Sequence, residues 1–92
     1  MVKVQNMQSS RGNTIPNQFI ITTDKGEYFQ SYRSVIAFRP NKGKIQLDET
    51  YWDYSVTTGR YRNMFLNECK ADTIRKIDSG EYVLADLNKE EV

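Results

Sequence analysis

The chain has 92 residues, of which 38% are hydrophobic and 12% aromatic, and its 13 Lys and Arg nearly balance its 12 Asp and Glu, for a net charge of +1. A chain of this length has apolar surface for one hydrophobic core, so we expect a single domain over residues 1–92. It contains no histidine and one cysteine, Cys69. Imidazole is the usual general base near neutral pH, and Cys and His supply most zinc ligands. The composition therefore argues against an enzyme, and we expect no catalytic residue, no cofactor and no metal.

Residues 1–48 are typical of β-structure. "MVKVQNM" alternates apolar and polar residues, whereas "QSSRGNTIPN" is predicted to be a loop because Gly12 and Pro16 are unsuited to the middle of a strand. Two hairpins follow, "NQFIITT" with "EYFQSY" around "DKG", and "SVIAFR" with "KIQLD" around "PNKG". We expect this part of the chain to form a twisted antiparallel sheet of about five strands.

The hydrophobic period then changes from two to about 3.6, which predicts a helix capped by Ser55 or Thr57. Its apolar face is predicted to hold Tyr54, Tyr61, Phe65 and Cys69. The cysteine is thus expected to be a small core residue.

A second short helix is predicted at "ADTIRKIDSG", with Asp72 as its cap and Gly80 as its left-handed end. The helical segment would then span residues 54–79, with a last strand over 81–87 and a flexible, solvated tail over 88–92. The predicted fold class is α+β: an antiparallel sheet of five to six strands, with one or two short helices packed on one face.

Tyrosine and arginine are the candidate binding residues of the chain. On the strand "EYFQSYR", Tyr28 and Tyr32 would share one face and form an exposed row, while Arg60 and Arg62 would straddle the apolar stripe of the helix and point toward water. Tyrosine also builds cores, so the same rings have a structural alternative, and Trp52 is expected in the core. The candidate partner-binding or nucleic-acid-binding residues are Tyr28, Tyr32, Arg33, Tyr51, Arg60 and Arg62.

Two kinds of partner fit these residues. Stacking of bases on tyrosine with arginine on phosphate suits single-stranded nucleic acid, but a net charge of +1 offers few cations for counterion release. Tyrosine and arginine also anchor protein interfaces, so a protein partner is the first expectation and single-stranded nucleic acid the second. Pairing of an exposed edge strand with a second copy would give a homodimer.

The acidic residues Asp48, Glu49 and Asp53 lie close in sequence but lack the spacing of a calcium loop, so a solvated acidic corner is expected there. No run approaches the length of a membrane span, and the start of the chain lacks the pattern of a signal peptide. We therefore expect no membrane partner and a cytoplasmic protein.

Several strings together carry a resemblance: "SSRGN", "PNQFIITT", "YFQSY", "YWDYSVTTGRYRN" and "SGEYVLADLN". The chain resembles a family of small uncharacterised proteins of bacteriophages and other mobile elements, a domain of unknown function, over about residues 9–88. The resemblance implies no site residue. It implies a bacterial host cell as the setting and a stoichiometric inhibitor or modulator of a host protein, such as a nucleic-acid-processing or defence complex, as the role.

Overall fold

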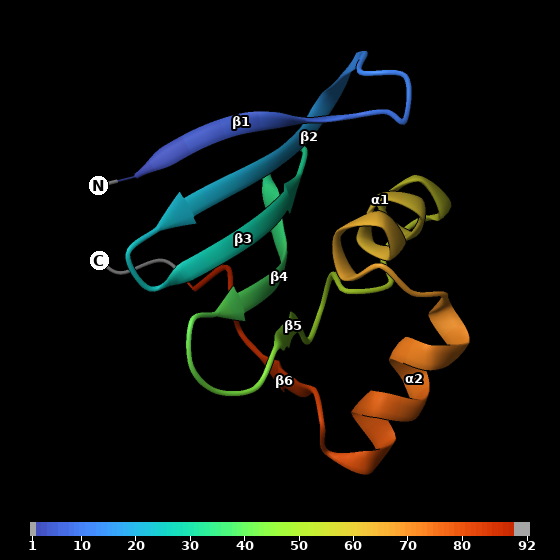
Figure 1. Cartoon of the computed structure of the whole chain (residues 1–92). Coiled ribbons are helices and arrows are strands. Elements are labelled where there is room, and N and C mark those ends of the chain that lie inside the picture. The colour runs from blue at the N-terminus through green and yellow to red at the C-terminus, as the bar shows by residue number, and fades with distance from the viewer. Residues whose placement is uncertain (1, 90–92) are drawn as a thin grey trace.

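The computed structural model describes residues 2–89 and shows a six-stranded sheet with two helices, which confirms the predicted α+β fold (Figure 1). The strands lie in the sheet in chain order, and the sheet is open rather than closed into a barrel. The elements are β1 (Lys3–Gln8), β2 (Thr14–Thr23), β3 (Gly26–Ser31), β4 (Ser34–Pro40), β5 (Gln46–Asp48), α1 (Val56–Leu66), α2 (Lys70–Ser79) and β6 (Val83–Ala85).

The prediction of a wholly antiparallel sheet is wrong at one edge. Strands β1 to β5 pair antiparallel, but β6 pairs parallel with β5, with Gln46 opposite Val83 and Asp48 opposite Ala85. Both helices lie in the connection between these two strands. A long crossover of this kind returns the chain to the end of the sheet at which β5 began, so the new strand runs in the same direction.

The β2–β3 hairpin has a two-residue turn, because Thr23 pairs with Gly26. Gly26 has a φ of 147°, and a Cβ added there would lie 2.2 Å from the carbonyl oxygen of Arg39. Only glycine fits so close an approach of β3 to β4.

The predicted loop over residues 8–17 is shorter than expected, because β2 begins at Thr14 and includes Pro16. Within the described chain, this first part of β2 has a ladder partner only in β1, where the register shifts between Asn6 and Gln8. Proline lacks an N–H, and it is tolerated here because the strand has no neighbour on its other side.

The core lies on the face of the sheet that carries the helices. Phe29 is fully buried there and stacks on Phe65 of α1 with ring centroids 5.7 Å apart. Trp52 and Tyr61 are half-buried and pack against this cluster. The buried members of the core are Met7, Ile15, Phe29, Ile36, Ala37, Leu47, Phe65, Leu66 and Tyr82.

The helix starts differ in part from prediction. Ser55 caps α1 as expected, its Oγ accepting the amide of Thr58 at 3.1 Å, so Tyr54 precedes the helix instead of lying on its apolar face. Helix α2 begins at Lys70, so Cys69 is an exposed residue at the helix boundary rather than a core residue. Asp72 consequently falls inside the first turn and is not the cap. Gly80 ends α2 in the left-handed conformation, as predicted.

The expected acidic corner is also wrong, because Asp48 is buried and acts as a backbone clamp. Its two carboxylate oxygens accept the amides of Thr50, Tyr51 and Leu87. The predicted tail over residues 88–92 is wrong at its first residue, since the side chain of Asn88 both accepts from and donates to the backbone of Val35. Residues 90–92 lie outside the described part of the chain.

Candidate functional site

A pocket of about 450 Å³ lies between the β3–β4 turn and the start of α1. Its lining contains three tyrosines, one arginine and several hydroxyl groups, and we call it the tyrosine–arginine pocket. The lining residues are Ser31, Tyr32, Arg33, Ser34, Ile36, Tyr51, Tyr54 and Thr58.

The first wall of the pocket is set by a tight turn. Ser31 pairs with Ser34, so Tyr32 and Arg33 form the two-residue connection, and Tyr32 adopts a left-handed φ of 56°. This conformation is unusual for a bulky residue. It is held here by two hydrogen bonds: the Tyr32 amide donates to the carbonyl of Asn17 in β2, and the side chain of Gln30 in β3 donates to the Tyr32 carbonyl. The turn displays the ring of Tyr32, which is 55% exposed.

The second wall comes from the segment before α1. Tyr51 and Tyr54 meet edge to face with ring centroids 5.5 Å apart, a favourable aromatic geometry. Tyr51 is anchored through its amide, which donates to Asp48 at 2.8 Å. Tyr54 is 68% exposed, directly before the Ser55 cap. The pocket thus has one ring held in place and two rings, Tyr32 and Tyr54, open to a partner.

Polar groups lie at the inner end of the pocket. The hydroxyls of Ser31 and Thr58 are 3.1 Å apart, and both residues are buried. Gln18 faces Ser31 in the β2–β3 register, is buried as well, and its Oε1 has no hydrogen-bond partner among residues 2–89. Since hydroxyls both donate and accept, this inner end can satisfy a polar group that enters between the rings.

Arg62 was expected to point toward water, and this prediction is wrong. The residue is 1% exposed and donates to the carbonyl of Trp52 at 2.7 Å and to Oδ1 of Asp53 at 3.3 Å. Its guanidinium also lies over the Trp52 ring, 5.2 Å from the centroid. Arginine can lose its hydration here because its charge is paired with Asp53 and both of its terminal nitrogens have acceptors. Arg62 therefore anchors Trp52 and Asp53, the two residues between Tyr51 and Tyr54.

Asp53 completes this clamp by bridging two cations. Its carboxylate lies 3.3 Å from Arg62 and 2.7 Å from Lys70, which links the segment before α1 to the start of α2. Burial alone would raise the pKa of Asp53, but the hydrogen bonds and charges of Lys70 and Arg62 outweigh it and hold the pKa below its ordinary value. The carboxylate is ionised at neutral pH and is engaged in structure.

The six residues predicted as a binding site do not form one site: Arg60 and Arg62 line a separate pocket at the start of α1, and the other four divide further. The structure brings Tyr32, Arg33 and Tyr51 together in one pocket. Tyr28 does not join them: it is half-buried and stacks on Phe38 at 4.2 Å, on the sheet face opposite the core residue Phe29. The predicted row of Tyr28 and Tyr32 does not exist, because the strand ends at Ser31 before Tyr32 is reached.

Five lining residues of the pocket were missed by sequence reasoning: Ser34, Ile36, Tyr54 and the hydroxyl pair Ser31 and Thr58. For Tyr54 the signal was available, because a cap at Ser55 places the preceding residue outside the helix and off its apolar face. For the hydroxyls no sequence signal exists, since their pairing joins positions 27 residues apart.

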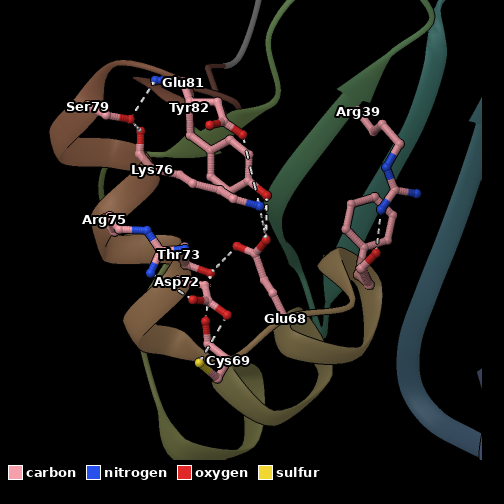
Figure 2. Close-up of polar contacts among 11 residues, drawn as sticks. Arg39, Glu68, Cys69, Asp72, Thr73, Arg75, Lys76, Ser79, Glu81 and Tyr82 are labelled. Atoms are coloured by element: carbon pink, nitrogen blue, oxygen red, sulfur yellow. Dashed lines mark hydrogen bonds and ion pairs between the residues drawn. The ribbon is translucent and has the colours of Figure 1, made fainter.

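A separate polar cluster around Glu68, in the α1–α2 connection, joins this connection to α2 and to Tyr82, which directly precedes β6 (Figure 2). The Glu68 carboxylate accepts from Thr73 and Lys76 at 2.7 Å each and from the Tyr82 hydroxyl at 2.8 Å. Burial raises the pKa of Glu68, but these hydrogen bonds outweigh it and bring the pKa below its ordinary value. Burial and the same carboxylate raise the pKa of Tyr82. Because the ionised Glu68 carboxylate accepts hydrogen bonds from Thr73, Lys76 and Tyr82, the cluster is suited to a structural role.

Among residues 2–89 no group of three or more His, Cys, Asp or Glu could hold a metal ion. No helix in this part of the chain is long and apolar enough to span a bilayer.

These features define a class: a small α+β protein with an open six-stranded sheet, two short helices and an aromatic pocket at the end of the sheet. Within this class, the chain belongs to a family of unknown function, DUF8033, whose model matches residues 2–81. The expectation of an uncharacterised family is confirmed. No curated protein and no solved structure matches the chain.

Proposed function

We propose that this protein is a non-enzymatic binding protein that captures a partner protein in the tyrosine–arginine pocket. The convergence of Tyr32, Arg33 and Tyr54 carries the proposal, because two exposed rings and an exposed guanidinium from distant parts of the sequence meet around one pocket. Tyrosine and arginine are the residues most enriched among energetic anchors of protein interfaces.

The lining favours a neutral or acidic group of the partner. Among residues 2–89, Arg33 is the one charged residue that lines the pocket, and no carboxylate of this part of the chain lies in the lining to repel an anion. The buried hydroxyls of Ser31 and Thr58 would meet the polar end of the inserted group, while the rings would cover its apolar body. A cavity of about 450 Å³ has room for one large side chain.

We propose further that the protein originates from a bacteriophage or another mobile element and acts in the bacterial cytoplasm on a host protein. The absence of histidine and the resemblance described above support a stoichiometric inhibitor or modulator over an enzyme. A defence complex, in the manner of an inhibitor of CRISPR systems, is the kind of target that we favour.

Capture of a host protein by the tagged chain from bacterial lysate, followed by titration of the purified pair, tests this proposal. We expect the double variant Tyr32→Ala/Tyr54→Ala to weaken binding at least about tenfold, since truncation of an anchor residue costs roughly 1 to 4 kcal/mol. Tyr28→Ala is the matched control, because it removes a tyrosine from the opposite sheet face. If the control weakens binding as much as the double variant, or if neither does, the pocket is not the interface.

Single-stranded nucleic acid is the second candidate partner. The exposure of Tyr32 and Tyr54 beside Arg33 favours it, because bases stack on exposed rings for about 1 to 3 kcal/mol each. Titration of labelled single strands at 50 and about 200 mM salt would show binding that falls with salt and is lost in Tyr32→Ala/Tyr54→Ala. Equal binding by wild type and this variant would exclude the pocket as a nucleic-acid site.

A further inference from the structure

A second pocket, of about 740 Å³, lies at the start of α1, and two of its lining residues, Asp53 and Ser55, flank Tyr54 of the tyrosine–arginine pocket in the sequence. We call it the α1 pocket. It is lined by Asp53, Ser55, Val56, Gly59, Arg60, Arg62, Asn63 and Lys70.

The charges of the α1 pocket are unbalanced. Arg60, Arg62 and Lys70 contribute three positive charges, and Asp53 contributes one negative charge, which leaves a net +2. The Asp53 carboxylate is already shared between Arg62 and Lys70, so it offers little repulsion to an incoming anion. Arg60 has no ion-pair partner among residues 2–89 and is exposed.

The helix itself adds donors at the same place. Helix α1 has 11 residues and no acidic residue in its first turn, so its positive N-terminal end is not compensated by its own side chains. The Ser55 side chain accepts the amide of Thr58, and the Ser55 carbonyl accepts that of Gly59. In the described chain the amides of Val56 and Thr57 have no acceptor, as is usual for the first residues of a helix.

An independent observation comes from Arg62, which lines this pocket and is 1% exposed. Its Nε has no hydrogen-bond partner among residues 2–89, although its other nitrogens are engaged. Gly59 also lines the pocket, and a Cβ added there would contact the guanidinium at 3.6 to 3.9 Å. The missing side chain leaves the terminal nitrogens of the guanidinium next to the pocket, and the same side chain carries one buried N–H, at Nε, that has no acceptor among residues 2–89.

We propose that the α1 pocket is a binding site for a phosphate group. A phosphate dianion matches the net +2 of the lining, and its oxygens would accept from Arg60, Lys70 and the free amides of α1. The inference goes beyond the function proposed above, because it assigns a ligand to a different pocket and does not depend on the tyrosines.

Thermal unfolding and calorimetric titration of the whole chain with inorganic phosphate, against sodium chloride at equal ionic strength, test the site. We expect phosphate to raise the Tm of the wild type in a saturable way. Arg60→Gln/Lys70→Gln should weaken phosphate binding at least about tenfold, since hydrogen bonds to charged groups are stronger than those between neutral groups. Lys25→Gln/Lys42→Gln is the matched control: it removes two exposed charges away from the pocket and should leave phosphate binding unchanged.

Gly59→Ala provides a second, independent variant. The added methyl group makes ordinary contacts and favours the helix, so we expect a higher Tm without phosphate. Because the methyl group would lie between the Arg62 guanidinium and the pocket, it would separate this positive charge from the phosphate, and we expect weaker phosphate binding at the same time. A loss of affinity in a more stable protein cannot arise from unfolding.

Competition identifies the source of the phosphate. Displacement of bound phosphate by a single-stranded oligonucleotide would assign the pocket to a nucleic-acid backbone, and displacement by a phosphomonoester alone would assign it to a small phosphate compound. Both outcomes support the site. No saturable effect of phosphate, or equal affinity in wild type, Gly59→Ala and Arg60→Gln/Lys70→Gln, would overturn it. Tyr32→Ala/Tyr54→Ala should bind phosphate normally, which separates failure of this site from failure of the tyrosine–arginine pocket.

Discussion

Replacement of Glu68 by Gln is the sharpest test of how α2 is held between its two connecting segments. The Glu68 side chain is 6% exposed, and its two oxygens accept three hydrogen bonds, one of them from the ammonium group of Lys76 (Figure 2). Glutamine keeps the shape and one carbonyl oxygen but removes the charge. Hydrogen bonds to a charged group contribute about 1.5 to 3 kcal/mol, against roughly 1 for neutral pairs.

We therefore expect Glu68→Gln to lower the free energy of unfolding by about 2 kcal/mol at pH 7, because the acceptor loses its negative charge and the ion pair with Lys76, which is itself partly solvated, is lost. In a chain of this length such a loss lowers the Tm by roughly 10 °C. Urea and thermal unfolding followed by circular dichroism measure both quantities.

The pH dependence of this loss is specific to the carboxylate. The pKa of Glu68 in the folded protein lies below its ordinary value of 4.5, so its charge stabilises the fold fully above that pH. The contribution is lost as the pH falls through the lower, folded pKa. Wild type and Glu68→Gln should therefore converge in stability as the pH is lowered from 7 toward 2.

Glu81→Gln is the matched control for this experiment. Glu81 also lies near Lys76, at 3.9 Å, but its side chain is 63% exposed, so we expect a change below about 0.5 kcal/mol. The reasoning would be refuted if Glu68→Gln lost the same amount of stability at every pH, or lost none at pH 7.

Three further substitutions test other contacts by chemical denaturation. Arg62→Ala should lower the free energy of unfolding by about 3 to 5 kcal/mol, since it leaves buried acceptors without a donor. Arg60→Ala on the exposed face should change it by less than about 0.5 kcal/mol, and equal effects of the two variants would contradict the burial of Arg62. Asp48→Ala should lower the free energy of unfolding by roughly 3 kcal/mol, because three hydrogen bonds from backbone amides are lost. Hydrogen exchange at these three amides should become faster, and an unchanged exchange rate would contradict the clamp. Gly26→Ala should destabilise by more than about 2 kcal/mol, because its Cβ would lie 2.2 Å from a backbone oxygen of β4; a neutral result would show that the hairpin adjusts freely.

The candidate site was predictable only in part, for reasons visible in individual residues. Tyr32, Arg33 and Tyr51 were selected by residue type, and the fold places them in one pocket. Arg62 was assigned to the surface because a charged side chain beside an apolar stripe is normally solvated. Its burial depends on the Trp52 carbonyl and Asp53, which reach it from the segment before α1. The pairing of Arg62 with these acceptors cannot be predicted from the local sequence, because it depends on how α1 packs against the segment before it.

The sequence by itself determined the local elements of this protein: the alternation that makes the hairpins, the Ser55 cap of α1 and the left-handed end of α2 at Gly80. These depend on interactions within a few residues, which propensity and periodicity record. Only the tertiary structure decided the parallel edge of the sheet, the burial of Asp48 and the placement of Tyr32 and Tyr54 around one pocket. Each of these joins distant segments, and the energy that selects them arises from packing and hydrogen bonds that exist only after the chain has folded.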